Sequence, residues 1–163
     1  MKIVLVLLIT ACAACSSFIQ RQKIVLSESS LITLERTACY GTCPTYIVAI
    51  SGNGQVALKG SKYLTRSQSV PLPDVSKTIT KEQLDALASA FDRVDFLSLS
   101  NESIRKGANC ATDNPSAIIS LTLDGKKTSV THDHGCEGNE KLKELTNLEQ
   151  MIDELAGTKD WLK

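Results

Sequence analysis

The residues of this 163-residue chain that are best suited to chemistry are histidines and cysteines. His132, His134 and Cys136 occupy every second position, so an extended backbone would point all three side chains to one face. Imidazole and thiolate groups are ligands of zinc and copper, and Cys39 and Cys43 would add ligands if they lay nearby. Alternatively, both imidazoles hydrogen-bond the adjoining loop. The N-terminal residues described below indicate an exported protein, and thiols of exported proteins tend to be oxidised, so we expect no bound metal and no other cofactor.

Four cysteines follow the N-terminal region: Cys39, Cys43, Cys110 and Cys136. An even number in an exported chain favours two disulfides, for which three pairings exist. Gly41 permits a tight turn between Cys39 and Cys43, and Pro44 favours an extended backbone at Cys43. We therefore predict the pairs Cys39–Cys43 and Cys110–Cys136, with crossed pairing as the alternative.

Cys39 and Cys43 also raise the possibility of a thiol-redox pair. Thioredoxin-type motifs place two residues between the cysteines, at a helix N-terminus that lowers the pKa of the thiol. Here three residues intervene, and Pro44 leads toward a predicted strand. The spacing thus favours a structural disulfide over a redox-active one.

Asp113 is the most interesting polar residue outside the cysteines and histidines. It lies just before a predicted strand, where an aspartate commonly accepts hydrogen bonds from backbone amides two residues on. We predict that structural role; a ligand-facing role, shared with His132 and His134, is the alternative. A hydrolytic triad of Asp113, one histidine and a serine can be drawn. However, the chain has no Gly-x-Ser-x-Gly, His-Glu-x-x-His or phosphate-binding glycine motif, so we expect it not to be an enzyme.

Residues 1–15 are typical of a lipoprotein signal peptide. Lys2 precedes an apolar stretch, residues 3–9, that is too short to span a bilayer. The residues after it resemble the bacterial lipobox, in which a lipid-accepting cysteine follows an aliphatic residue at −3 and a small residue at −1. Residues 9–12, Ile-Thr-Ala-Cys, fit this pattern better and favour Cys12, whereas Cys15 gives the more usual signal length. A soluble secreted protein cut nearby is the other interpretation.

Acylation would give the mature protein a membrane anchor. Several acyl chains, such as palmitate, hold a protein firmly where one chain alone is marginal. No aspartate follows Cys12 or Cys15, which favours a place in the cell envelope at the outer membrane or facing the periplasm. The chain contains 18 basic and 18 acidic residues and has no basic stripe, so we exclude nucleic acid as a partner.

Hydrophobic periodicity predicts a tether at residues 16–23 and a single disulfide-stabilised domain at residues 24–163. Alternating residues predict strands at 31–36, 46–50, 55–59, 62–65, 119–123 and 127–131. Turn residues at 51–54 and 124–125 predict hairpins, and Pro71 and Pro73 predict a loop. A capping box at Thr80 and Gln83 begins one amphipathic helix, and Gly157 ends a second. We expect an α+β fold: an antiparallel sheet built from hairpins, with the two helices packed on one face.

The cysteine-containing segments resemble an uncharacterised family of bacterial lipoproteins, a domain of unknown function. The similarity lies in residues 34–44, with their Cys-x-Gly-x-Cys-Pro signature, in residues 110–115 and 132–136, and in the ending around Trp161. The resemblance implies an envelope location and one domain, and it implies no substrate or catalytic residue.

These features favour a lipid-anchored envelope protein with a non-enzymatic binding or structural role. Its partners would be the membrane, through the N-terminal lipid, and an envelope protein or small ligand. The alternative is a metal-binding or thiol-redox module that uses the cysteines and histidines. An apolar patch or groove on the solvent-facing side of the sheet would favour a binding role, and a uniformly polar face would favour a structural role.

Overall fold

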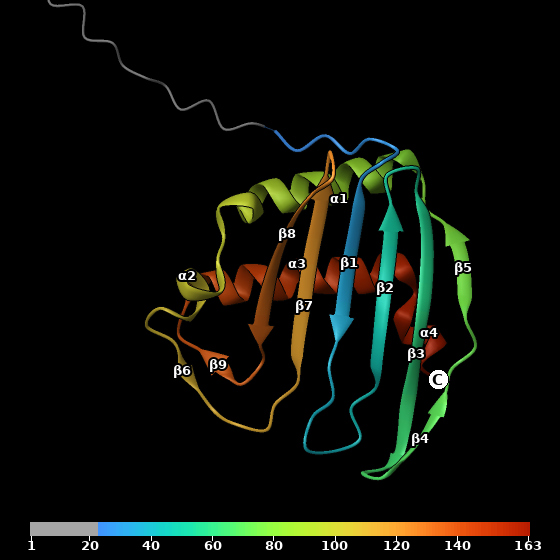
Figure 1. The fold of residues 1–163 in the computed structure, drawn as a ribbon, viewed down its shortest axis with the longest axis vertical. Helices are drawn as coiled ribbons and strands as arrows, with labels where there is room; N and C mark the ends of the chain where they lie inside the picture. The colour runs from blue at the N-terminus through green and yellow to red at the C-terminus, as the bar shows by residue number, and fades with distance from the viewer. Residues whose placement is uncertain (1–22) are drawn as a thin grey trace, which may run out of the picture.

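The structure is a computed structural model that describes residues 23–163 (Figure 1). The predicted signal peptide, Cys12, Cys15 and all but the last residue of the predicted tether lie outside the described residues. Within them, no helix is long and apolar enough to cross a membrane.

A seven-stranded antiparallel sheet forms one layer of the fold. Its strands run in the order β4-β3-β2-β1-β7-β8, with β5 also pairing with β3. The bounds are β1 Leu31–Arg36, β2 Thr45–Ser51, β3 Gln55–Thr65, β4 Gln68–Pro71, β5 Val75–Thr78, β7 Ser116–Leu123 and β8 Lys126–Asp133. Because β1 lies between β2 and β7, it joins the two predicted hairpins into one sheet.

Helices form the second layer. Figure 1 shows α1 (Lys81–Arg93) and α3 (Glu140–Ala156) side by side on one face of the sheet. The shorter helices are η1 (Phe96–Ser98), α2 (Asn101–Arg105) and α4 (Thr158–Trp161), and a two-stranded ribbon pairs β6 (Asn109–Cys110) with β9 (Cys136–Glu137). This arrangement confirms the predicted α+β class.

The core fills the space between the helices and the inner face of the sheet. Alternate residues of each central strand are buried, as in Ile32 and Leu34 of β1. They meet the apolar stripes of the helices, including Phe91 of α1 and Leu145 of α3. The outer face is mixed rather than uniformly polar: Leu31 and Ile47 are exposed on it, and Thr33 and Ser120 share a hydrogen bond of 2.6 Å there.

Local signals position both main helices as predicted. The Thr80 hydroxyl accepts from the Gln83 amide while the Gln83 side chain accepts from the Thr80 amide, so the capping box is confirmed. Gly157 ends α3 in the left-handed conformation, which glycine adopts without a Cβ clash.

The strand predictions were wrong at one edge of the sheet. Residues 62–65 continue β3 instead of forming a separate strand, and the region predicted as a proline loop contains β4 and β5. Pro71 stands at the end of β4. These edge segments are mostly exposed and polar, so they carry no apolar alternation that would reveal a strand.

Candidate functional site

A buried cluster of ionisable side chains lies between α3 and the sheet. At its centre is Glu149, whose side chain is completely buried. Glu149 occupies the same stripe of α3 as Leu145 and Ile152, so the helix periodicity that builds the core also places this carboxylate in it. An unpaired buried carboxylate is costly, and the surrounding residues must therefore supply hydrogen bonds and positive charge.

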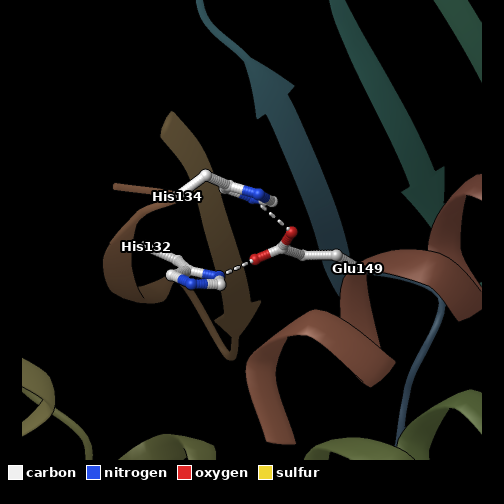
Figure 2. Close-up of side chains that lie close together, drawn as sticks. All are labelled: His132, His134 and Glu149. Atoms are coloured by element: carbon white, nitrogen blue, oxygen red, sulfur yellow. Dashed lines mark hydrogen bonds and ion pairs between the residues drawn. The ribbon is translucent and has the colours of Figure 1, made fainter. Parts of the chain in front are cut away.

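Two histidines bind the carboxylate from one side (Figure 2). His132 Nδ1 lies 2.6 Å from Glu149 Oε1, and His134 Nε2 lies 2.9 Å from Glu149 Oε2. The two imidazole rings are stacked, with centroids 4.4 Å apart and an interplanar angle of 24°. Each imidazole thus lies within hydrogen-bonding distance of a different oxygen of the carboxylate.

Arg36, at the end of β1, supplies the positive charge. Its Nη1 donates to Glu149 Oε2 at 2.6 Å and its Nη2 donates to Asp153 Oδ2 at 2.7 Å. The Tyr46 hydroxyl donates to the other oxygen of Asp153 at 2.8 Å. One guanidinium therefore joins two carboxylates that lie one turn apart on α3, and Tyr46 adds a hydrogen bond to the second of them.

His134 has two possible partners at a single nitrogen. Besides Glu149, its Nε2 lies 3.0 Å from Arg36 Nη1, which can only donate. His134 Nε2 can accept from Arg36 or donate to Glu149, but one nitrogen cannot do both at once. The tautomer of His134 therefore decides which of the two bonds forms.

The cluster shifts the pKa values of its members. Burial alone would raise the pKa of Glu149, but hydrogen bonds from His132 and His134 and the charge of Arg36 outweigh it and lower that pKa to about 2. Burial and the neighbouring Asp153 raise the pKa of Tyr46 to about 12. Burial would lower the pKa of Arg36, but Glu149 and Asp153 raise it overall. The cluster thus holds an ionised Glu149 beside a permanently charged guanidinium.

The same three residues offer a set of metal ligands. One ligand atom each from His132, His134 and Glu149 lies within 4.8 Å of the others. Two histidines and a carboxylate are a common ligand set for zinc. However, the stacked rings point at separate oxygens, and Arg36 places a positive charge next to Glu149 and His134. Metal binding would need the imidazoles to converge and Arg36 to withdraw.

Beside the histidines a shallow groove of about 340 Å³ opens to the surface. Its lining includes His132, His134, Asn139, Lys143 and Asn147. His134, whose side chain is 31% exposed against 18% for Arg36 and Asp153, is the most accessible of the ionisable residues of the cluster.

The cysteines pair as predicted, Cys39 with Cys43 and Cys110 with Cys136. Cys110 and Cys136 stand opposite each other in the β6–β9 ribbon. The backbone from His132 to Cys136 is not continuously extended, because β8 ends at Asp133 and a turn separates it from β9, yet all three of these side chains line the same groove. The disulfides also leave none of these four cysteines as a free thiolate ligand.

Asp113 does not have the predicted hydrogen bonds. Its backbone is left-handed (φ 68°), its carbonyl oxygen accepts from the Tyr40 amide at 3.1 Å, and its carboxylate accepts from the Thr112 hydroxyl at 3.3 Å. The bond expected of it is made instead by Asp133, whose Oδ1 accepts from the Gly135 amide at 2.9 Å. Asp113 is exposed and is not a member of the histidine cluster.

Sequence reasoning missed Arg36, Tyr46, Glu149 and Asp153. A signal for one of them was available: a glutamate on the apolar stripe of a helix must be paired inside the core. The others follow only from the three-dimensional arrangement, because Arg36 is 113 positions from Glu149.

Comparison with known protein families gives a match over most of the domain. Residues 30–156 match a family model described as Domain of unknown function (DUF6438). No curated protein matches the chain.

Proposed function

The chain belongs to this family of unknown function, and we propose that it is an exported, lipid-anchored, non-enzymatic binding module of the cell envelope. The observation that carries the proposal is that all four cysteines of residues 23–163 are joined in two disulfides. Disulfides persist in oxidising compartments and are rare in the cytosol. Together with the N-terminal lipobox, they support maturation outside the cytoplasm.

The polar cluster supports a non-enzymatic role. Catalytic carboxylates must reach a substrate, whereas Glu149 is completely buried and both of its oxygens are hydrogen-bonded. Arg36 also donates a hydrogen bond to Asp153 within the cluster. The ionisable side chains of the cluster therefore bond to one another and join α3 to the sheet.

A surface suited to a protein partner lies at the end of the domain formed by the loop 37–44 and the β3–β4 turn (Figure 1). There Tyr40 is 67% exposed, and the guanidinium carbon of Arg66 lies 4.0 Å from the centre of its ring. Leu64, close by in β3, is 55% exposed. We call Tyr40, Leu64 and Arg66 the distal pole. Tyrosine and arginine are enriched among the residues that dominate binding energy, and the Cys39–Cys43 bridge holds this loop in place.

Fractionation and mass analysis of the natural protein test the proposal. We expect a membrane-bound protein that incorporates labelled palmitate, with an intact mass showing acyl chains and two disulfides. Cys12→Ser should abolish labelling, and Cys15→Ser should leave it, if Cys12 is the acceptor; the reverse result would assign Cys15. Recovery of an unacylated cytosolic protein with reduced thiols would contradict the proposal.

The binding role has its own test. A photo-crosslinking residue at position 40 should give a discrete crosslinked species in intact cells, and Arg66→Ala should weaken it. A crosslinker at Glu154, exposed on α3, is the matched control. Equal crosslinking from both positions would remove the distal pole as a binding surface.

Metal binding is the second candidate function, because His132, His134 and Glu149 already lie together. Titration of the chelator-treated protein with Zn²⁺ should produce saturable binding at one equivalent if this function is correct. His134→Ala should abolish that binding, while Lys143→Ala, in the neighbouring groove, should leave it unchanged. If the Zn²⁺ titration of the wild-type protein shows no saturable binding, or an affinity no higher than that of His134→Ala, this candidate is eliminated.

A further inference from the structure

We propose that the end of the domain at which the described chain begins is a membrane-contact surface that rests on the phospholipid bilayer. We call its residues Lys23, Val25, Leu97 and Lys126 the proximal pole. This inference rests on the proposed lipid anchor and adds an orientation of the domain relative to the membrane.

The proximal pole surrounds a groove of about 400 Å³. The groove lies between the segment at residues 23–25, η1 and the turn of the β7–β8 hairpin. Its lining consists of Lys23, Ile24, Val25, Leu97, Leu123, Asp124, Lys126 and Thr128. Figure 1 shows this hairpin turn and the N-terminal segment at the same end of the sheet, opposite the β3–β4 turn.

Aliphatic side chains at the rim of this groove are unusually open to solvent. Val25 is 75% exposed and Leu97 is 45% exposed, although neighbouring Ile24 is almost fully buried. Lys23 and Lys126 flank these two residues. Aliphatic groups inserted at the headgroup boundary, with ammonium groups beside lipid phosphates, are the usual pattern of interfacial membrane binding.

Charge at the proximal pole favours the same partner. Lys126 and Lys127 follow the β7–β8 turn, and both are exposed. Asp124 is the acidic residue in the groove lining. Lys23 and Lys126 of the lining outnumber Asp124, so the rim of the groove carries a small excess of positive charge that suits anionic phospholipids, while Asp92 is held at the Ile24 amide.

The attachment of the chain directs this pole toward the membrane. The Ile24 side chain is only 5% exposed, and its amide donates to Asp92 Oδ1 at 2.9 Å, which fixes where the tether enters the domain. Residues 12–22 separate a lipid on Cys12 from this point. At about 3.5 Å per residue these eleven positions span at most roughly 40 Å, and a lipid on Cys15 would shorten that reach to about 30 Å. The tether therefore keeps its entry point within roughly 40 Å of the bilayer and makes the proximal pole the end of the domain nearest the lipid along the chain.

Depth-dependent fluorescence quenching tests the orientation. Full-length acylated protein carrying Leu97→Trp is inserted into phosphatidylcholine vesicles containing brominated lipid, with and without phosphatidylglycerol. Leu64→Trp at the distal pole is the matched control, since Leu64 has a similar exposure of 55%. The wild-type protein corrects for Trp161, and Val25→Trp serves if Leu97→Trp does not fold.

We expect brominated lipid to quench the tryptophan introduced by Leu97→Trp or Val25→Trp at least about twofold more than the one introduced by Leu64→Trp. Phosphatidylglycerol should increase the difference at low salt and not at high salt, because surface charge is screened. Equal quenching of both poles, in protein whose intact mass shows acyl chains, would overturn this inference and leave the lipid anchor standing. Self-association through Leu97 without quenching would assign the pole to a second copy and likewise overturn it. Absence of acyl chains would overturn both proposals.

Discussion

Arg36 on β1 and Glu149 on α3 form a short ion pair across the core, with 2.6 Å between Nη1 and Oε2. The second arm of the guanidinium pairs with Asp153 at 2.7 Å. The apolar contacts of α3 have no direction, so this pair, together with the bonds of His132 and Tyr46 to the same two carboxylates, favours one position of the helix over the end of β1. A buried pair of this kind is costly to break from one side, since the partner is left as an uncompensated charge.

The first prediction concerns the charge of Glu149. Glu149→Gln keeps the shape of the side chain but removes the fully buried negative charge next to Arg36, which then keeps only Asp153, and its amide nitrogen needs an imidazole in the accepting tautomer. We expect the free energy of unfolding to fall by about 3 kcal/mol or more in urea denaturation. Asp85→Asn, in the exposed Lys81–Asp85 pair, is the control and should change the stability little. A similar effect in both variants would mean that the pair does not stabilise α3.

The second prediction is a dependence of stability on acid. The pKa of folded Glu149 is about 2, against an ordinary value of 4.5, so the unfolded chain takes up the proton first as the pH falls. The stabilisation is complete above about pH 4.5 and is lost as the pH falls toward 2. Wild type should therefore lose stability in this window, and Glu149→Gln should lose less.

Asp160 provides the control for the acid experiment. Its pKa is also lowered, by Lys163, but the group is fully exposed and its contribution is screened by solvent. Asp160→Asn should follow the wild-type curve of unfolding free energy against pH. Parallel curves for wild type and Glu149→Gln would contradict the assignment of the acid response to the buried cluster.

The third prediction concerns the Tyr46 hydroxyl. Burial and Asp153 raise its pKa to about 12, so its stabilisation is present below about pH 10 and is lost as the pH rises through 12. Tyr46→Phe keeps the edge-to-face contact with Trp161 but removes the hydrogen bond to Asp153, at a cost of about 2 kcal/mol. In a tyrosinate absorbance titration the variant should lack the step near pH 12, whereas Tyr63→Phe should retain it. Persistence of that step in Tyr46→Phe would disprove the assignment.

The sequence was most informative where local chemistry determines structure. Alternating residues located β1 and β2, turn residues located the hairpins, and Thr80 and Gln83 placed the start of α1. Spacing and turn propensity were also enough to choose the disulfide pairs. Apart from Cys110 and Cys136, which stand 26 positions apart, the determining residues lie close together in the chain.

The sequence did not predict most of the candidate site, because its contacts join residues far apart in the chain. His132 and His134 were candidates by type, but their partner Glu149 appeared only as one more helical residue. Cys136 lines the same groove as both histidines, but its sulfur is bonded to Cys110 and is therefore no ligand beside them. Periodicity indicates which face a residue occupies, and only the packing of α3 on the sheet shows which residues meet there.

The fourth prediction tests the turn at residues 134–135, between β8 and β9. A Cβ on Gly135 would lie 2.1 Å from the Ala111 carbonyl oxygen and 2.9 Å from the Asn114 side-chain nitrogen, so the backbone would have to move. Gly135→Ala should destabilise the fold by about 1–3 kcal/mol in thermal or urea unfolding, through overpacking. The matched control is Gly41→Ala, where the added Cβ meets only Cys39 Sγ at 3.4 Å. If both variants were equally stable, the backbone of Gly135 could not lie as close to the Ala111 carbonyl oxygen as described.

The last prediction separates the two disulfides. Cys110–Cys136 closes a loop with a sequence separation of 26, against 4 for Cys39–Cys43. In the chain-entropy description, the longer loop is worth about 3.5 kcal/mol and the shorter one about 2 kcal/mol, because cross-linking removes more freedom from the longer unfolded segment. Replacing Cys110 and Cys136 together by alanine should therefore lower the unfolding free energy more than the corresponding change at Cys39 and Cys43. The opposite order, measured by urea unfolding under non-reducing conditions, would show that the loop at Tyr40 contributes native-state stability beyond its entropy.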